Sequence, residues 1–298
     1  MKFYIIIISI VVFIIFVFVL RLFINKNISE DLTDIFKPKK GRVIISMTTS
    51  PKRIHKIYEC INSLENQTIK PDLYFINLPN IFKRDGSTFS DIPEFLIKDN
   101  IILNFCEDLG PATKIVPTCK SDIVTEDDII FSIDDDIKYP SEIIQLYLKY
   151  HSLYPNYVLS GWSSFRKKPD KNHDILYEIF MLEGFSCVLY KKSFLEDIPL
   201  EMFDKNKVPI YHYLSDDLVL SNYLESKQIG ILGFGSNSII KDIKPLKYGE
   251  QEDALHKGAN GLSVIGLNQD ANNNNYNKTA KFLKKSNSYY LPADYIYI

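Results

Sequence analysis

Several features that would place this 298-residue sequence in a common class of protein are missing from it. Its four cysteines, Cys60, Cys106, Cys119 and Cys187, include no C-x-x-C pair, which argues against a zinc site. Its formal net charge is −2, and we find no basic stripe of the kind that a phosphate backbone demands. We therefore expect no nucleic-acid partner.

Glycine-rich nucleotide loops are missing as well. The segment after the first expected strand, SMTTSPKR, contains no glycine, so a Rossmann dinucleotide fingerprint is excluded there. No G-x-x-x-x-G-K-[ST] segment occurs, which argues against a P-loop enzyme. No G-x-S-x-G segment occurs either, which argues against an α/β-hydrolase.

The N-terminus carries the most apolar stretch of the chain. Residues 3–20 contain no charge, and as a helix they would extend ~27 Å, close to the ~30 Å hydrocarbon core of a bilayer. We expect a transmembrane anchor over 1–24 and a polar stalk over 25–41. A cleavable signal peptide is the alternative, but no small-x-small site follows in RLFINKNISE.

The sequence thus predicts a single-pass membrane protein with an N-terminal anchor. Its orientation stays open, because Lys2 lies on one side of the apolar run and Arg21 and Lys26 lie on the other. A type II-like arrangement would place the domain in the lumen if the membrane is secretory. Only then would the N-glycosylation patterns matter, which begin at Asn27, Asn66 and Asn277.

From Arg42 onward, strand-like and helix-like segments alternate. We expect strands at 42–48, 73–78, 100–105 and 128–133, and helices at 54–67, 111–120 and 141–154, the last capped by Ser141. In the less regular second half we expect strands at 157–162, 176–182, 185–190 and 229–234, a helix at 216–227, and a loop at Asn272–Asn275. This alternation predicts an α/β fold with a mostly parallel central sheet flanked by helices.

Three consecutive carboxylates, Asp134, Asp135 and Asp136, follow the expected strand 128–133 in the segment FSIDDDIKYP. Adjacent like charges repel, and burying one without a partner would cost roughly several kcal/mol, so a positive partner is expected. Oxygen ligands at a strand end suit a hard divalent cation, Mg²⁺ or Mn²⁺. The alternative is an acidic turn exposed to water.

Other polar segments should meet this triplet, because ligands in open α/β sheets bind beyond the carboxyl ends of the strands. Thr49 and Arg53 follow the first strand, and EDLGPATK, with Asp108 and Lys114, follows the third. These four side chains could contact a nucleotide. Asp108 and Lys114 could equally be solvated loop charges.

Four segments, in this order, resemble GT-A-fold glycosyltransferases, most closely the large family-2-like group: VIISMTTSPKRIHKIYECINSLENQT, FSIDDDIKYP, GFSCVLYKKSFL and SDDLVLSNYL. The resemblance runs from about residue 42 to about residue 231. DLGPATK is similar to a segment of a subgroup that carries GPATK before its DxD motif. The chain departs from the family in lacking an obvious Q-x-x-R-W segment.

The resemblance implies a GT-A catalytic domain over 42–298, with a nucleotide-binding half at about 42–140 and an acceptor half at about 141–298. It implies a membrane-anchored, metal-dependent hexosyl- or related transferase that moves a sugar from a nucleotide-diphospho-sugar to a hydroxyl of a glycan, protein or lipid. An Asp at the position of the family's base favours inversion.

Residue roles follow from the same resemblance. Asp134 and Asp136 match the DxD pattern, with Asp136 as the direct metal ligand and Asp134 reaching the ribose or a metal-bound water. Asp217 matches the general base, and Asp216 would cap the helix or position the acceptor; both could instead only favour the helix dipole. Asp135 is counted with the nucleotide contacts.

Two further residues have open roles. His256 could be a late metal ligand or a structural or exposed histidine, and Trp162 could stack on a sugar or lie in the core. Two rival functions also stay open. One is a sugar nucleotidyltransferase, against which no phosphate loop follows the first strand. The other is a non-enzymatic, anchored carbohydrate-binding or surface protein.

Overall fold

The computed structural model describes residues 41–161, 176–235, 238–250 and 271–292, which belong to one compact unit, Lys40–Ile298. The expected anchor at 1–24 and nearly all of the expected stalk lie outside the described residues, as do Trp162 and His256. Within the described ranges, no helix is both long enough and apolar enough to cross a membrane. The anchor therefore stays a prediction.

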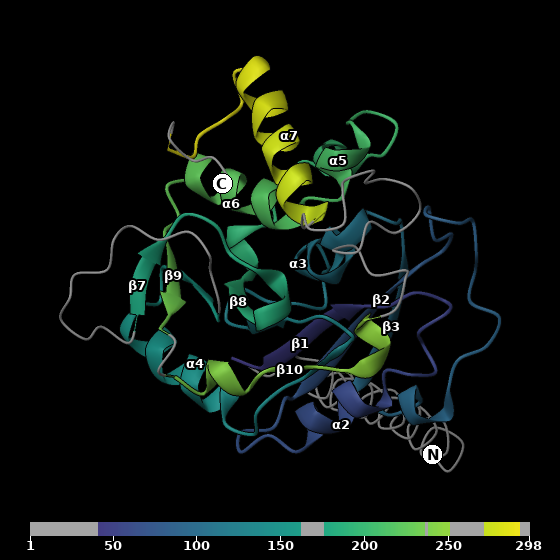
Figure 1. Cartoon of the computed structure of the whole chain (residues 1–298). Helices are drawn as coiled ribbons and strands as arrows, with labels where there is room; N and C mark the ends of the chain where they lie inside the picture. Colours follow the sequence, from purple (N-terminus) through teal and green to yellow (C-terminus); the bar gives the residue numbers. More distant parts are fainter. Residues whose placement is uncertain (1–40, 162–175, 236–237, 251–270, 293–298) are drawn as a thin grey trace, which may run out of the picture. The chain divides into compact units, whose positions relative to one another are not determined.

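The core of this unit is an eight-stranded sheet in the order β3-β2-β1-β4-β8-β6-β9-β7 (Figure 1). The strands are β1 (Val43–Thr48), β2 (Leu73–Pro79), β3 (Ile101–Cys106), β4 (Ile129–Ser132), β6 (Val158–Ser160), β7 (Leu176–Ile179), β8 (Val188–Lys191) and β9 (Ile231–Phe234). Only β7 and β8 run against the other six. The predicted α/β class with a large, mostly parallel sheet is confirmed.

Two helical layers explain why β1 is apolar on both faces. Ile45 and Met47 point into a core with α2 (Tyr58–Glu65) and α4 (Ile143–Leu153). Ile44 points into a second core with α3 (Val116–Cys119) and α6 (Asp216–Ser226). Side chains alternate across a strand, and a central parallel strand must bury both sets, which accounts for the sequence VIISMT.

The last described helix, α7 (Ala271–Lys285), packs against α5 (Ile210–Tyr213) and α6 (Figure 1). The expectation of a loop at Asn272–Asn275 is therefore wrong, because these residues belong to α7. Tyr276, Ala280 and Leu283 are spaced four and three residues apart and are all buried. This apolar stripe stabilises the helix through tertiary packing, although asparagine is a poor helix former.

Two local expectations also differ from the structure. Ser141 does not cap α4: Glu142 occupies the N-cap position, and the Ser141 hydroxyl donates to the Glu142 carboxylate. The expected strand at 185–190 begins only at Val188, because Gly184–Ser186 form a 3₁₀ turn. Cys187, with φ of 73°, makes the sharp change of direction from this turn into β8.

Candidate active site

The candidate site lies beyond the carboxyl ends of β1, β3 and β4. Thr49 follows β1 directly, Asp108 follows β3 by two residues, and Asp134 follows β4 by two residues. Parallel neighbouring strands bring these ends to one edge, as the topology predicts. We call Asp134, Asp135 and Asp136 the strand-end triplet, and Asp216 and Asp217 the helix-start pair.

Arg53 is a positive partner of the strand-end triplet. Its Nη1 lies 3.2 Å from Asp135 Oδ1 and 2.9 Å from Asp136 Oδ2. Thr49 donates its hydroxyl to Asp135 Oδ2 at 2.6 Å, so both oxygens of this buried carboxylate have partners. In this structure Thr49 and Arg53 therefore support the triplet, while their predicted contact with a nucleotide stays a prediction.

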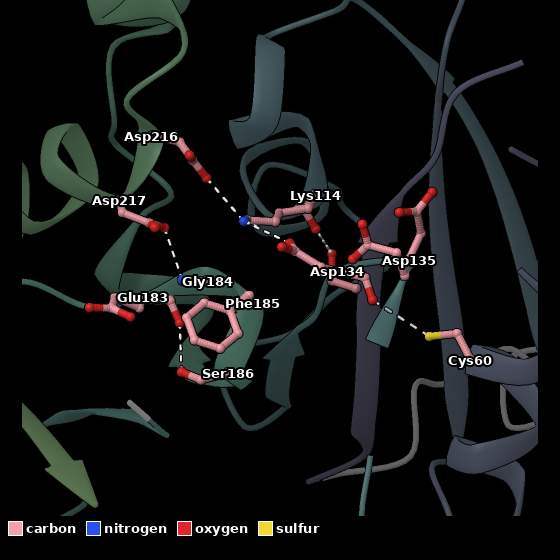
Figure 2. A network of polar contacts seen from close by, with 12 residues as sticks. Cys60, Lys114, Asp134, Asp135, Glu183, Gly184, Phe185, Ser186, Asp216 and Asp217 are labelled. Atoms are coloured by element: carbon pink, nitrogen blue, oxygen red, sulfur yellow. Dashed lines mark hydrogen bonds and ion pairs between the residues drawn. The ribbon is translucent and has the colours of Figure 1, made fainter. Parts of the chain in front are cut away.

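Lys114 is the second positive partner, and it joins the two groups of carboxylates. Its Nζ lies 2.9 Å from Asp134 Oδ1 and 3.2 Å from Asp216 Oδ2, as Figure 2 shows. Burial by itself would lower the pKa of Lys114, but Asp134, Asp216 and Asp217 hold it well above the ordinary value. The lysine is thus a charged ammonium inside the protein, with only 8% of its side chain exposed.

The backbone of the triplet is fixed from two directions. Tyr139 accepts a hydrogen bond from the Asp134 amide at 3.1 Å and donates its hydroxyl to the Phe185 carbonyl at 3.1 Å. Tyr248 donates its hydroxyl to the Asp135 carbonyl, and the Leu246 amide donates to the Asp136 carbonyl at 2.7 Å. The carboxylates are therefore held on a rigid turn rather than on a free acidic loop.

The helix-start pair opens α6, as the sequence predicts, but both of its members are buried. Asp217 accepts hydrogen bonds from the Gly184 amide at 3.0 Å on Oδ1 and from the Tyr276 hydroxyl at 3.1 Å on Oδ2. Burial, followed by the negative charge of Asp216, holds the pKa of Asp217 well above its usual range. A carboxyl with a raised pKa is a stronger base than an ordinary aspartate once it is ionised.

Gly184 is required by this arrangement. A Cβ atom at this position would lie 2.2 Å from Lys114 Nζ and 2.9 Å from Asp217 Oδ1. Any side chain there would push the lysine or the aspartate out of place. Figure 2 shows Gly184 on the turn between Glu183 and Phe185, next to Asp217.

Asp108 holds the turn that carries Lys114. It accepts hydrogen bonds from the backbone amides of Lys83 and Gly110, at 2.6 and 2.8 Å, and from the Tyr213 hydroxyl at 2.9 Å. Gly110 has φ of 66°, a conformation that glycine adopts without strain. Asp108 and Lys114 are both buried, so the alternative of solvated loop charges is wrong for both.

A buried polar chain beneath Lys114 was not predicted from the sequence. The Ser46 hydroxyl donates to the Lys114 carbonyl at 2.5 Å and lies 2.6 Å from the Thr118 hydroxyl, which also accepts from Asn77 at 2.8 Å. Asn104 donates to Asn77 at 2.7 Å. The sequence feature that could have predicted this polar chain is a polar residue in each of three apolar strands, β1, β2 and β3.

Asp134 and Asp136 are the residues that could hold a metal ion. Their side chains are 32% and 20% exposed, and each has one oxygen without a partner among the described residues. Burial, with the charges of Asp135 and Asp134, raises the pKa of Asp136 to about 7. When fully ionised, the four carboxylates that contact Arg53 and Lys114 carry −4 against +2, so a divalent cation would favour their ionised forms.

These two carboxylates fit a hard cation that takes its other ligands from water and phosphate oxygens. They do not make a cage of protein ligands: within the described ranges, no group of three or more His, Cys, Asp or Glu side chains could hold a metal. His256, predicted as a further ligand, lies outside these ranges.

No protein-family model matches the sequence, and no curated protein matches it significantly. Crystal structures of S. aureus TarS are similar to parts of this chain. One has 12% identity and a TM-score of 0.43, and the match covers 66% of this chain and 36% of TarS. TarS 1–349 in complex with UDP has 10% identity and a TM-score of 0.42, and the match covers 82% of this chain and 72% of the TarS chain. TarS 1–349 alone has 12% identity and a TM-score of 0.42, with 83% and 73% covered.

The chain therefore spans about a third of the length of the first of these TarS chains. All three TM-scores lie below 0.5, so the function proposed next rests on the residues and geometry of this chain.

Proposed function

We propose that this chain is a membrane-anchored, metal-dependent glycosyltransferase that uses a nucleotide-diphospho-sugar. One observation carries the proposal: Lys114 brings the strand-end triplet and the helix-start pair into one buried network at the carboxyl end of the sheet. In the sequence, these are the two acidic segments that resemble the DxD motif and the base of GT-A glycosyltransferases. Their meeting at the edge where α/β folds bind ligands supports a common reaction.

The nucleotide half of the site would be the strand-end triplet with its supports. Asp134 and Asp136 would hold Mn²⁺ or Mg²⁺ through their unengaged oxygens, while Thr49 and Arg53 keep Asp135 in place. When bound, such an ion neutralises negative charge on the departing nucleotide diphosphate. Four carboxylates share the two cationic side chains Arg53 and Lys114, and this surplus of acidic groups supports the role.

Asp217 would act as the general base. The acceptor hydroxyl oxygen forms a bond to the anomeric carbon, its proton passes to Asp217, and the bond to the nucleotide diphosphate breaks with the electron pair on the diphosphate. The raised pKa of Asp217 and its two fixed hydrogen bonds support this assignment. Attack opposite to the leaving group would invert the anomeric centre.

Phe185 is our candidate for contact with a sugar ring, a role for which Trp162 was considered from the sequence. Its side chain is 39% exposed, although its neighbours Gly184 and Ser186 are buried. Its carbonyl is held by Tyr139, the same residue that holds the Asp134 amide. An aromatic face at this position could pack against the apolar face of a pyranose.

The acceptor and the membrane complete the proposal. A glycan, a protein or a lipid would each supply the required hydroxyl, and the apolar residues 3–20 support an N-terminal anchor. The type II-like placement stays an expectation, because basic residues on both sides of that segment leave its orientation open.

The test is binding of UDP and GDP to the purified full-length chain in detergent, by calorimetry, with and without Mn²⁺. We expect micromolar to millimolar binding of one nucleotide that requires Mn²⁺, and its loss in Asp136→Asn, because an amide is a poor ligand for a hard cation. Unchanged affinity in the variant would remove the metal assignment. Release of pyrophosphate from a nucleoside triphosphate and a sugar phosphate would favour a nucleotidyltransferase, and no nucleotide binding would favour a carbohydrate-binding protein.

A further inference from the structure

The side chain of Lys114 is enclosed by three segments that are far apart in the sequence. Its ammonium contacts Asp134 after β4 and Asp216 at the start of α6, and the Gly184 backbone packs against it closely enough to exclude a Cβ. Figure 2 shows the ammonium between the two carboxylates. A lysine in such a place is neither a surface charge nor free to reach solvent.

Hydrogen bonds to the backbone hold the segment that carries Lys114 in place. Ser46 of β1 donates to the Lys114 carbonyl, and Asp108 fixes the preceding turn through the Gly110 amide. Removing an ammonium from water is costly unless carboxylates compensate for it. The two ion pairs at 2.9 and 3.2 Å supply that compensation, so the position of Lys114 and the position of Asp134 depend on each other.

This dependence has a consequence for the metal ion, and here the inference rests on the proposed function. Asp134 would be shared between the ammonium and a divalent cation. Two cations on one carboxylate repel each other, and the repulsion is weakly screened where water is excluded. Arg53 would share Asp136 with the metal in the same way. It also pairs with Asp135, for which no direct contact with the metal is predicted.

We propose that Lys114 is a positioning residue that serves as an internal cation of the site: it aligns Asp134 with Asp216 and competes with the divalent cation for Asp134. In the protein without nucleotide, a divalent cation bound to Asp134 then weakens the ion pair between Asp134 and Lys114 that aligns the two acidic groups. A nucleotide diphosphate, which brings additional negative charge, relieves this competition. Metal and nucleotide should therefore bind cooperatively.

The experiment measures Mn²⁺ binding to the full-length chain without nucleotide, from the electron paramagnetic resonance signal of free Mn²⁺. Lys114→Gln should bind Mn²⁺ about tenfold more tightly than the unchanged protein, because one repelling charge is removed. Lys114→Arg keeps the charge and should bind no more tightly than the unchanged protein. Lys98→Gln is the control: it removes the same charge from a surface pair with Glu65 and should change nothing.

A second readout separates positioning from simple charge removal. Lys114→Gln should transfer sugar more slowly while binding Mn²⁺ more tightly, and the cooperativity between Mn²⁺ and nucleotide should shrink. Circular dichroism melting checks that the variants are folded. If Lys114→Gln does not fold, Lys114→Arg still decides, because tighter Mn²⁺ binding by that variant contradicts the proposal.

Failure of the inference and failure of the proposed function look different. Equal or weaker Mn²⁺ binding by folded Lys114→Gln would overturn the role of Lys114 and leave the metal-dependent transferase in place. Absence of Mn²⁺ binding in every variant, with and without nucleotide, would overturn the metal dependence and this inference together. Binding by Lys114→Gln alone would support the competition directly.

Discussion

The strand-end triplet and the helix-start pair are both acidic, yet their partners differ in kind. Asp135 and Asp136 contact the guanidinium of Arg53, and Asp134 contacts the ammonium of Lys114. Asp217 is held by a backbone amide and a tyrosine hydroxyl, which are neutral. Ionic partners favour the charged form of a carboxylate, but burial and neighbouring charges still raise the pKa of Asp136 to about 7. The neutral partners of Asp217 leave its pKa well above the usual range.

The comparison assigns different chemistry to the two groups. The strand-end triplet is partly exposed at Asp134 and Asp136, which agrees with the proposed binding of a metal ion there. The helix-start pair is enclosed, and its second member, Asp217, has a raised pKa. Lys114 forms ion pairs with both groups, so it lies between the residues proposed to bind the metal and the residue proposed to accept a proton.

The largest expected effect separates the two groups directly. Asp217→Asn removes the proton acceptor with little change in volume, so transfer should fall by ~10²–10⁴-fold while Mn²⁺ and nucleotide still bind. Turnover at saturating nucleotide sugar and nucleotide affinity by calorimetry are the measurements.

Asp216→Asn is the matched control for that variant, and it should cost less. A larger loss at Asp216 would move the base by one residue. Full activity of both variants would remove the inverting mechanism, and a retaining route would take its place.

A smaller effect is expected from Tyr276→Phe, which deletes one hydrogen bond to Asp217 and keeps the ring in its apolar contacts. Transfer should fall about 3–10-fold, in line with the modest net value of a single hydrogen bond. The pKa of Asp217 should rise further, so the acid limb of the rate profile should move to higher pH. Tyr290→Phe, at an exposed tyrosine, is the control and should leave both unchanged.

The smallest effect concerns the stability of the metal-free protein. The pKa of Asp136 is raised to about 7 in the folded state, so this group favours the folded state below about pH 4 and loses that contribution as pH rises through 7. Asp136→Asn should therefore melt higher than the unchanged protein at pH 8, by about 2–4 °C for each kcal/mol relieved, with a smaller difference at pH 5.

Differential scanning calorimetry in the presence of a chelator tests this. A lower melting temperature of the variant at pH 8 would show that the contact of Asp136 with Arg53 outweighs the repulsion within the triplet. That result would contradict the raised pKa of Asp136 on which this prediction rests.

Sequence reasoning placed the residues of the proposed nucleotide half at the edge of the sheet where the structure has them. Strands β1 to β4 are short, β-branched and separated by clear turns, so Thr49, Arg53, Asp108, Lys114 and the triplet could be placed at one edge by topology alone. Their partners could not be predicted, because contacts such as that between Arg53 and Asp136 depend on side-chain geometry across 83 residues.

The acceptor half was harder to predict from the sequence, for a physical reason. Helix α7 begins with asparagines, whose propensity favours turns, and only burial against α5 and α6 makes it helical. Without α7, Tyr276 could not be recognised as a partner of Asp217. The turn at Gly184–Ser186 could not be predicted either, because the residue types of the segment, such as Phe185, favour a strand.

The contact between Asp217 and Tyr276, which joins residues 59 positions apart, also bears on how the protein is made. A chain leaves the ribosome from its N-terminus, so the triplet, Arg53 and Lys114 are all synthesised well before α7. A product truncated before residue 271, by early termination or proteolysis, would keep the residues proposed to bind nucleotide but lack the hydroxyl that holds Asp217. Under the proposed function, such a fragment would lack a complete acceptor half and would not transfer the sugar.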